Sequence, residues 1–146
     1  MNGFRFPLQK VLDWRRTQLE LEESRFKQGL AAMASLDRER AGWEAAGIKA
    51  EIQVRDWNPL AGGDLAALGR FRVNVREREK EIDGRRAECR KLLDERQNSM
   101  LEARRRCRLL ERLKERRWRE WQAACDRELE QLAAESFLAR SAPRRS

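Results

Sequence analysis

The chain has 146 residues, of which 40% are charged and 40% are hydrophobic, and its formal net charge at pH 7 is +8. This balance is typical of a long helix or coiled coil and excludes a compact fold with a large core. The longest stretch without a charged residue, 28–36, has nine residues, far short of the about 20 that a membrane-spanning helix needs. Three cysteines, an odd number, favour a reducing compartment, so we expect a cytoplasmic protein.

The first predicted element is a helix over about residues 8–54. It begins after Pro7 and meets no further proline, which would break a helix, before Pro59. One set of apolar residues recurs every seven positions, as at one seam position of a coiled coil: Leu12, Leu19, Phe26 and Met33. The other seam position is imperfect, because it holds Arg15, Glu22 and Gly29.

A turn is predicted over residues 55–64, followed by a second helix over about residues 64–138. The turn contains Pro59 and a glycine pair, and Asp64 is a good N-cap residue. A tail, 139–146, completes the chain. The apolar residues of the second helix also recur every seven positions, in three sets that stutters would separate: Leu68, Val75, Ile82 and Cys89, then Leu93, Met100 and Cys107, and later Trp118, Cys125 and Leu132.

The two seams are in register with each other. In an antiparallel hairpin the numbers of facing residues have a constant sum, and Leu12 with Cys107 gives 119 while Trp43 with Val75 gives 118. We therefore predict an all-α fold, a two-helix antiparallel coiled-coil hairpin forming a single domain. The same arithmetic leaves about residues 112–138 as an unpaired C-terminal helical overhang.

The residue types argue against catalysis. The chain has no histidine and no tyrosine, and a two-helix hairpin has no pocket that would perturb a carboxylate or lysine for acid–base chemistry. Cys89, Cys107 and Cys125 are each 18 residues apart, which separates successive sulfurs by about 27 Å along a helix, whereas metal ligands must converge. We expect no enzyme activity, no metal site and no cofactor.

Basic charge is concentrated in the second helix. Residues 85–119 hold fourteen basic and six acidic residues, a net of +8, whereas residues 8–54 are balanced. The concentration is compatible with a solvated face that pairs internally, with a nucleic-acid surface, or with docking into an acidic protein cavity. Trp118 and Trp121 lie beside it.

Two motifs lie near the ends of the predicted arms. The first is Phe4-Arg5-Phe6-Pro7-Leu8-Gln9-Lys10-Val11-Leu12-Asp13-Trp14-Arg15. The second is Leu110-Glu111-Arg112-Leu113-Lys114-Glu115-Arg116-Arg117-Trp118, followed by Glu120-Trp121. Together with the two-arm layout over the whole length, they resemble the flagellar export protein FliJ family. The stalk proteins of injectisomes are similar, and the sequence leaves the choice between the two systems open.

The resemblance implies a non-catalytic stalk of the type III export apparatus, similar to the central stalk of rotary ATPases. The end with both termini would enter the hexameric export ATPase ring, and the turn end would reach the membrane export gate protein. Export chaperones are further partners of some members. The protein would then be cytoplasmic and peripheral on the cytoplasmic side of the membrane.

The resemblance also implies two sets of binding residues. Ring-binding residues would be Arg112, Arg116, Arg117, Trp118, Arg119 and Trp121. Gate-binding residues would be Phe71 and Val75, whereas on the first arm Gly47 and Ala50 replace bulkier family side chains.

Two further hypotheses remain beside the stalk. One is a basic coiled-coil nucleic-acid-binding protein, and the other is a purely structural, self-associating rod. The localised basic charge fits the stalk and the nucleic-acid binder and disfavours the purely structural rod. We expect no specific nucleic-acid partner.

Overall fold

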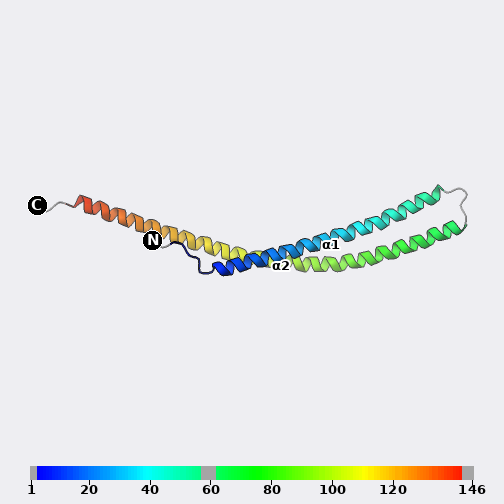
Figure 1. The fold of residues 1–146 in the computed structure, drawn as a ribbon, viewed down its shortest axis with the longest axis horizontal. Coiled ribbons are helices and arrows are strands. Elements are labelled where there is room, and N and C mark those ends of the chain that lie inside the picture. Colours follow the sequence, from blue (N-terminus) through cyan, green and yellow to red (C-terminus); the bar gives the residue numbers. More distant parts are fainter. Residues whose placement is uncertain (1–2, 57–61, 143–146) are drawn as a thin grey trace. The chain divides into compact units, whose positions relative to one another are not determined.

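The computed structural model describes residues 3–56 and 62–142, which form two long helices and no strand (Figure 1). Helix α1 spans Gln9–Arg55 and helix α2 spans Gly62–Ser141. Residues of both helices pack together in two compact units. We call Glu20–Leu101 the hairpin unit, and Met1–Leu19 with Glu102–Ser146 the terminal unit. The predicted all-α helical hairpin is confirmed.

The helix ends differ slightly from the predicted ones. Helix α2 begins at Gly62, so Asp64 is not the N-cap but lies in the first turn, where a carboxylate favours the positive end of the helix dipole. At the other end α2 continues to Ser141, whose Oγ donates a hydrogen bond of 2.9 Å to the carbonyl of Phe137. The predicted turn residues 57–61 and the tail residues 143–146 lie outside the described residues.

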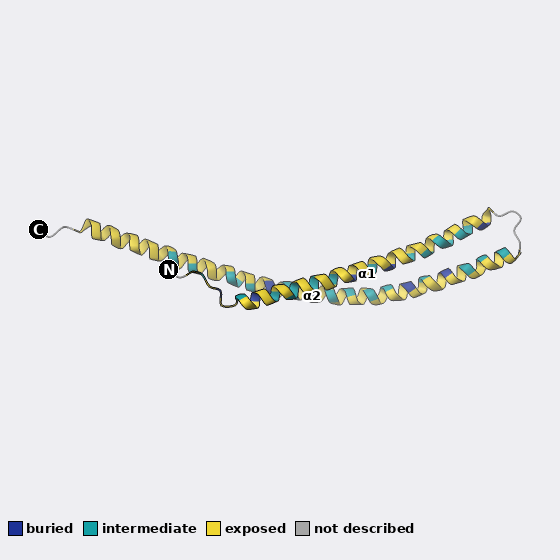
Figure 2. Ribbon diagram, in the orientation of Figure 1, coloured by how far each residue is buried: buried dark blue, intermediate teal, exposed yellow. Residues whose placement is uncertain are grey.

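The seam of the hairpin unit keeps an alternating three–four spacing (Figure 2). On α1 the buried and half-buried residues with this spacing are Phe26, Gly29, Met33, Leu36, Arg40, Trp43, Gly47, Ala50 and Val54. On α2 they are Val75, Glu79, Ile82, Arg86, Cys89, Leu93, Arg96 and Met100. The spacing on α2 is unbroken here, so the stutter predicted between Cys89 and Leu93 is wrong. Val75, Ile82 and Cys89 occupy one of the two seam positions of the heptad, and Leu93 and Met100 occupy the other, in a single continuous register.

Contacts at two glycines give the register. A Cβ atom added to Gly29 would lie 2.9 Å from Leu93 Cδ1, and the Sγ of Cys89 lies 4.0 Å from the Gly29 carbonyl oxygen. Gly29 thus sits between two residues of α2 that are four apart, with number sums of 118 and 122. The predicted sum of 118–119 corresponds to the first of these. Gly47 faces Val75, a pair whose number sum is 122, because a Cβ atom added to Gly47 would lie 3.6 Å from Val75 Cγ1.

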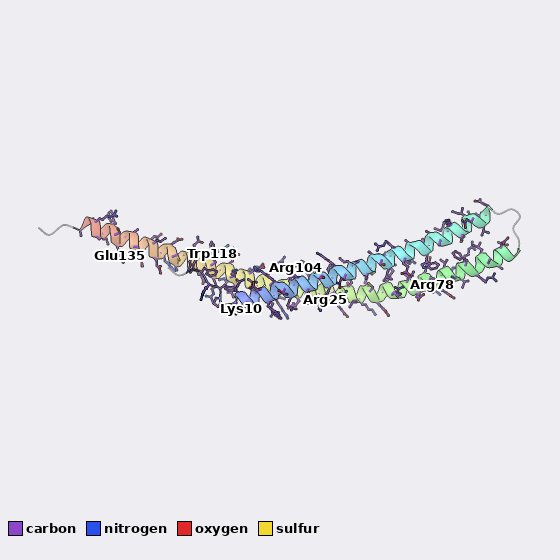
Figure 3. The ribbon with its side chains drawn as sticks, in the orientation of Figure 1. Lys10, Arg25, Arg78, Arg104, Trp118 and Glu135 are labelled. Atoms are coloured by element: carbon purple, nitrogen blue, oxygen red, sulfur yellow. The ribbon has the colours of Figure 1, made fainter. Side chains whose placement is uncertain are left out.

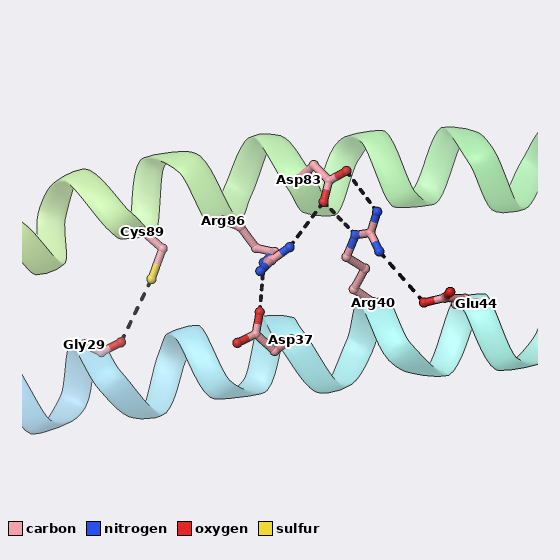
Figure 4. Close-up of polar contacts among 7 residues, drawn as sticks. All are labelled: Gly29, Asp37, Arg40, Glu44, Asp83, Arg86 and Cys89. Atoms are coloured by element: carbon pink, nitrogen blue, oxygen red, sulfur yellow. Dashed lines mark hydrogen bonds and ion pairs between the residues drawn. The ribbon is translucent and has the colours of Figure 1, made fainter.

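Arginines on the seam pair with carboxylates across it (Figure 4). Arg40 Nε donates a hydrogen bond of 2.7 Å to Asp83 Oδ1, and Arg86 Nε lies 2.8 Å from Asp37 Oδ1. Arg86 Nη1 also lies 3.6 Å from Asp83 Oδ1. The hydrogen bond from Arg40 lowers the pKa of Asp83, and the same bond raises the pKa of Arg40. Arg40 and Arg86 are therefore both paired across the helices.

The core of the terminal unit joins the N-terminal residues to the part of α2 around Cys107. Phe6, Leu12 and Cys107 are buried together, as the predicted pairing of Leu12 with Cys107 requires. Phe6 belongs to the non-helical residues 3–8, which we call the N-terminal strap, and its carbonyl accepts a hydrogen bond of 3.1 Å from the Gln9 amide. Burial raises the pKa of the Cys107 thiol, so this cysteine acts as a small apolar core residue.

The predicted overhang is shorter than residues 112–138, because the strap covers its beginning. The rings of Phe4 and Trp121 have centroids 6.0 Å apart, and Leu113 packs against the core. The strap is not helical, so its advance along α2 does not follow the 1.5 Å rise per residue of a helix. Residues 126–142 are all exposed (Figure 2).

Candidate protein-binding surface

Phe4 lies between two shallow grooves of the terminal unit. One groove is lined by Phe4, Lys114, Glu115 and Trp118, and the other by Phe4, Leu113, Arg117 and Trp121 among others. Trp118, labelled in Figure 3, is 43% exposed, whereas Trp121 is half-buried. Each groove thus combines an aromatic wall with a basic side chain from α2.

Five arginines form a stripe on α2, on the side opposite this aromatic surface. They are Arg105, Arg108, Arg112, Arg116 and Arg119. Their three–four–four–three spacing keeps them within about 80° around the helix axis and along about 21 Å of its length. Cys107 and Trp121, which face the core and the strap, lie about half a turn away. All five arginines are exposed. We call them the arginine stripe.

Ion pairing distinguishes the arginine stripe from its flanks. Arg119 Nη2 lies 2.6 Å from Glu115 Oε1, but the other four arginines form no ion pair with any residue that the structure describes. Elsewhere on α2, Arg106 pairs with Glu102 at 3.1 Å and Arg117 with Glu120 at 3.5 Å, and these two glutamates lie along one flank of the stripe. Internal pairing therefore neutralises the flanks more than the stripe, whose guanidinium groups remain available for carboxylates or phosphates.

The six predicted ring-binding residues separate into two groups. Arg112, Arg116 and Arg119 belong to the arginine stripe, whereas Arg117, Trp118 and Trp121 line the grooves beside Phe4.

The sequence prediction missed several neighbours of these residues. Phe4 and Lys114 line the grooves, and Arg105 and Arg108 extend the stripe. The three–four spacing of the arginines was the available signal for the stripe. The Phe4 contact depends on a non-helical strap that helical periodicity does not reveal.

The predicted gate-binding residues lie at the end of the hairpin unit near residue 62. Val75 is only 7% exposed and Phe71 is half-buried. A groove lined by Gly47, Ile48 and Val75 among others opens there, with an ion pair of 3.0 Å between Arg72 and Glu51 at its side. A partner would reach Val75 through this groove. The groove also contains Ile48, an exposed residue that the sequence prediction missed.

Neither a metal cluster nor a membrane span occurs within residues 3–56 and 62–142. No three histidine, cysteine or acidic side chains converge there to hold a metal ion, and no helix is long and apolar enough to cross a bilayer. Comparisons with known protein families, with curated proteins and with solved structures find no match.

Proposed function

We propose that this chain is a non-catalytic stalk of the flagellar type III protein export apparatus. In this proposal the terminal unit binds inside the hexameric export ATPase ring. The end of the hairpin unit near Phe71 and Val75 binds the membrane export gate protein at the cytoplasmic side of the membrane. The stalk would couple the two, and export chaperones would be further partners.

One observation supports the proposal most: the two motifs that carry the resemblance pack against each other. Phe4 and Phe6, from the first motif, contact Trp121 and the core residues around Cys107. Leu110 and Leu113, from the second motif, pack against the same core. Two segments about 100 residues apart in sequence thus build one surface, as expected if both motifs serve a single binding site.

The chemistry of this surface fits a protein partner. Tryptophan and arginine are the residues most enriched among binding hot spots, and the terminal unit presents both on opposite sides of one helix. A helix inserted into a ring is surrounded by protein, so side chains on all of its sides can bind the ring wall. The unpaired arginines of the stripe would attract acidic residues of the ring wall and speed association.

The test is a binding and hydrolysis assay with the cognate export ATPase. Replacing Trp118 and Trp121 together by alanine should weaken ring binding by about 2–4 kcal/mol and abolish stimulation of ATP hydrolysis. Binding to the gate protein through the Phe71 end should be retained. Unaltered binding and stimulation would remove the tryptophans from the mechanism.

Two control variants separate lost contacts from altered structure. Trp14→Ala removes another tryptophan of the terminal unit, one that is 52% exposed and lies under Arg15, and should leave ring binding unchanged. Phe4→Ala removes the strap contact to Trp121 while keeping both tryptophans. If Phe4→Ala alone reproduces the full loss, the strap rather than the tryptophans makes the site.

The four unpaired arginines of the arginine stripe also favour a second candidate, a nucleic-acid-binding helix. Against it, Glu102 and Glu120 lie along one flank of the stripe and Glu115 along the other. Carboxylates on both sides of the stripe would weaken its attraction for the phosphates of a nucleic acid.

A further inference from the structure

Two grooves of the terminal unit share the strap as a common wall. Residues 4–7 of the strap line both of them. One groove is completed by Leu8, Leu113, Arg117 and Trp121, and the other by Gln9, Lys10 and Lys114. Their volumes are about 460 Å³ and about 680 Å³, within the range of pockets that hold a ligand. We call them the strap grooves.

The strap grooves are basic, and no carboxylate of the described residues lines either of them. Their charged side chains are Arg5, Lys10, Lys114 and Arg117. Arg117 pairs with Glu120 at 3.5 Å, but the other three form no ion pair with any residue that the structure describes. Lys114 is also half-buried, and a charge that is partly withdrawn from water favours an opposite charge beside it. The grooves therefore favour an anionic ligand.

The walls between these charges are apolar. Phe4, Phe6 and Pro7 line both grooves, and Trp121 lines one of them. A phosphate ion would neutralise the charges but leave this aromatic surface exposed to water. A ligand that fills the grooves therefore needs apolar groups between its negative charges.

The strap also presents backbone groups that a peptide can bind. The Phe6 carbonyl accepts a hydrogen bond from the Gln9 amide, but the backbone groups of Phe4 and Arg5 form no hydrogen bond with any residue that the structure describes. Backbone N–H and C=O groups are strong hydrogen-bonding groups, and a bound peptide supplies partners for both along its own main chain. The free backbone therefore favours a peptide over a small anion.

We propose that the strap grooves bind an acidic peptide segment of a partner protein, in which carboxylates flank a large apolar side chain. The apolar side chain would lie against Phe4 and Pro7, and the carboxylates would pair with Arg5, Lys10 and Lys114. The inference deepens the proposed function and rests on it for the source of the segment, which would be the wall of the export ATPase ring.

The first test measures binding of a fluorescein-labelled synthetic peptide to the full-length protein by fluorescence anisotropy. The probe is a short peptide of glutamates with two phenylalanines at its centre. One control peptide carries glutamine in place of every glutamate, and the other carries alanine in place of both phenylalanines. Each control should bind about tenfold or more weakly, because it lacks either the charges or the apolar anchors. A probe that does not bind, or a control peptide that binds as tightly as the probe, overturns the proposal.

The second test locates the bound peptide with charge-reversal variants. Lys10→Glu combined with Lys114→Glu should weaken binding of the probe by about tenfold or more. The matched control, Lys27→Glu combined with Lys91→Glu, changes the net charge equally at exposed lysines of the hairpin unit and should leave binding nearly unchanged. Lysine and glutamate have similar helix propensities, and circular dichroism checks that helicity is retained. Equal weakening by both double variants would show only an effect of net charge and overturns the proposal.

A short single-stranded oligonucleotide tests the other class of anionic ligand, because bases can also stack on aromatic side chains. We expect it to bind more weakly than the probe at physiological salt. If it binds more tightly and loses that binding when Lys10 and Lys114 are reversed, the grooves belong to a nucleic acid and the proposal is overturned.

The fate of this inference is separable from that of the proposed function. The peptide assay contains no ATPase, so a wild-type protein that fails to bind the export ATPase would refute the stalk while the peptide result still decides the grooves. Conversely, an ATPase that binds the wild type and the Lys10→Glu, Lys114→Glu variant equally well would exclude the strap grooves from the ring contact and overturn the inference alone.

Discussion

Arginine occupies seam positions that a coiled coil ordinarily fills with apolar side chains. Arg40 and Arg86 lie on the hairpin seam and reach Asp83 and Asp37 across it, and Arg96 Nη1 donates a hydrogen bond of 3.1 Å to the Arg25 carbonyl. Because these pairs are partly exposed, each contributes little to stability. Their value is in the register: a slip of one heptad would separate each arginine from its partner.

The Arg40–Asp83 pair makes a prediction about pH. The pKa of Asp83 is lowered by the hydrogen bond from Arg40, so the stabilisation is fully present above the unfolded-state value of about 3.9 and lost as the pH falls through the folded-state value. Asp83→Asn should therefore lower the thermal midpoint at pH 7, and the difference from wild type should disappear once the pH falls below the folded-state value. Thermal unfolding followed by circular dichroism measures both.

A matched control is Glu81→Gln, which removes a carboxylate that pairs with Arg78 within α2 at 3.4 Å. Since that pair does not link the helices, we expect a much smaller change at pH 7. An Asp83→Asn difference that persists unchanged into strong acid would show that the loss is not electrostatic.

At the scale of the helices, Gly29 marks a position in the hairpin unit where α1 leaves no room for a side chain against α2. A glycine inside a helix lowers the stability of the helix by about 1 kcal/mol relative to alanine. From the sequence alone, every such glycine is expected to be destabilising. The structure separates two kinds. At Gly84 an added Cβ meets nothing within 4 Å, whereas at Gly29 it would lie 2.9 Å from Leu93 Cδ1.

Alanine substitutions should therefore have different effects. Gly84→Ala should stabilise the protein by about 1 kcal/mol through helix propensity. Gly29→Ala should gain no such stability and is expected to fall about 1–3 kcal/mol below Gly84→Ala, because Leu93 must move in a packed seam. Urea unfolding of both variants gives the comparison. Equal stabilisation by both would mean that Leu93 rotates away without cost.

At the scale of the whole molecule, the net charge of +8 predicts how the protein meets nucleic acids. A basic helix that contacts phosphates releases counterions, so its affinity depends steeply on salt. We expect weak binding that is independent of sequence and falls by about 10³-fold or more between 50 and 200 mM salt. Fluorescence anisotropy with two unrelated duplexes tests this. Tight, sequence-selective binding at physiological salt would favour the nucleic-acid candidate over the stalk.

The sequence by itself determined the two helices, their antiparallel pairing and their approximate register. Residues that recur every seven positions lie on the same face of a helix, whatever the residues between them are. This rule alone places Leu12, Ile82 and Cys107 on the seams. The ends were less predictable, because helix boundaries such as Gly62 and Ser141 depend on capping contacts that involve only a few atoms.

Tertiary structure alone decided the surface of the terminal unit. The strap is not helical, so its reach to Trp121 follows no helical period, and Phe4 becomes part of the grooves only once the chain is folded. Likewise, whether an arginine is paired depends on which carboxylate lies within a few ångströms, and that separates four arginines of the stripe from Arg106, Arg117 and Arg119. Periodicity fixes the face on which a side chain lies, whereas its partners are fixed by distances in three dimensions.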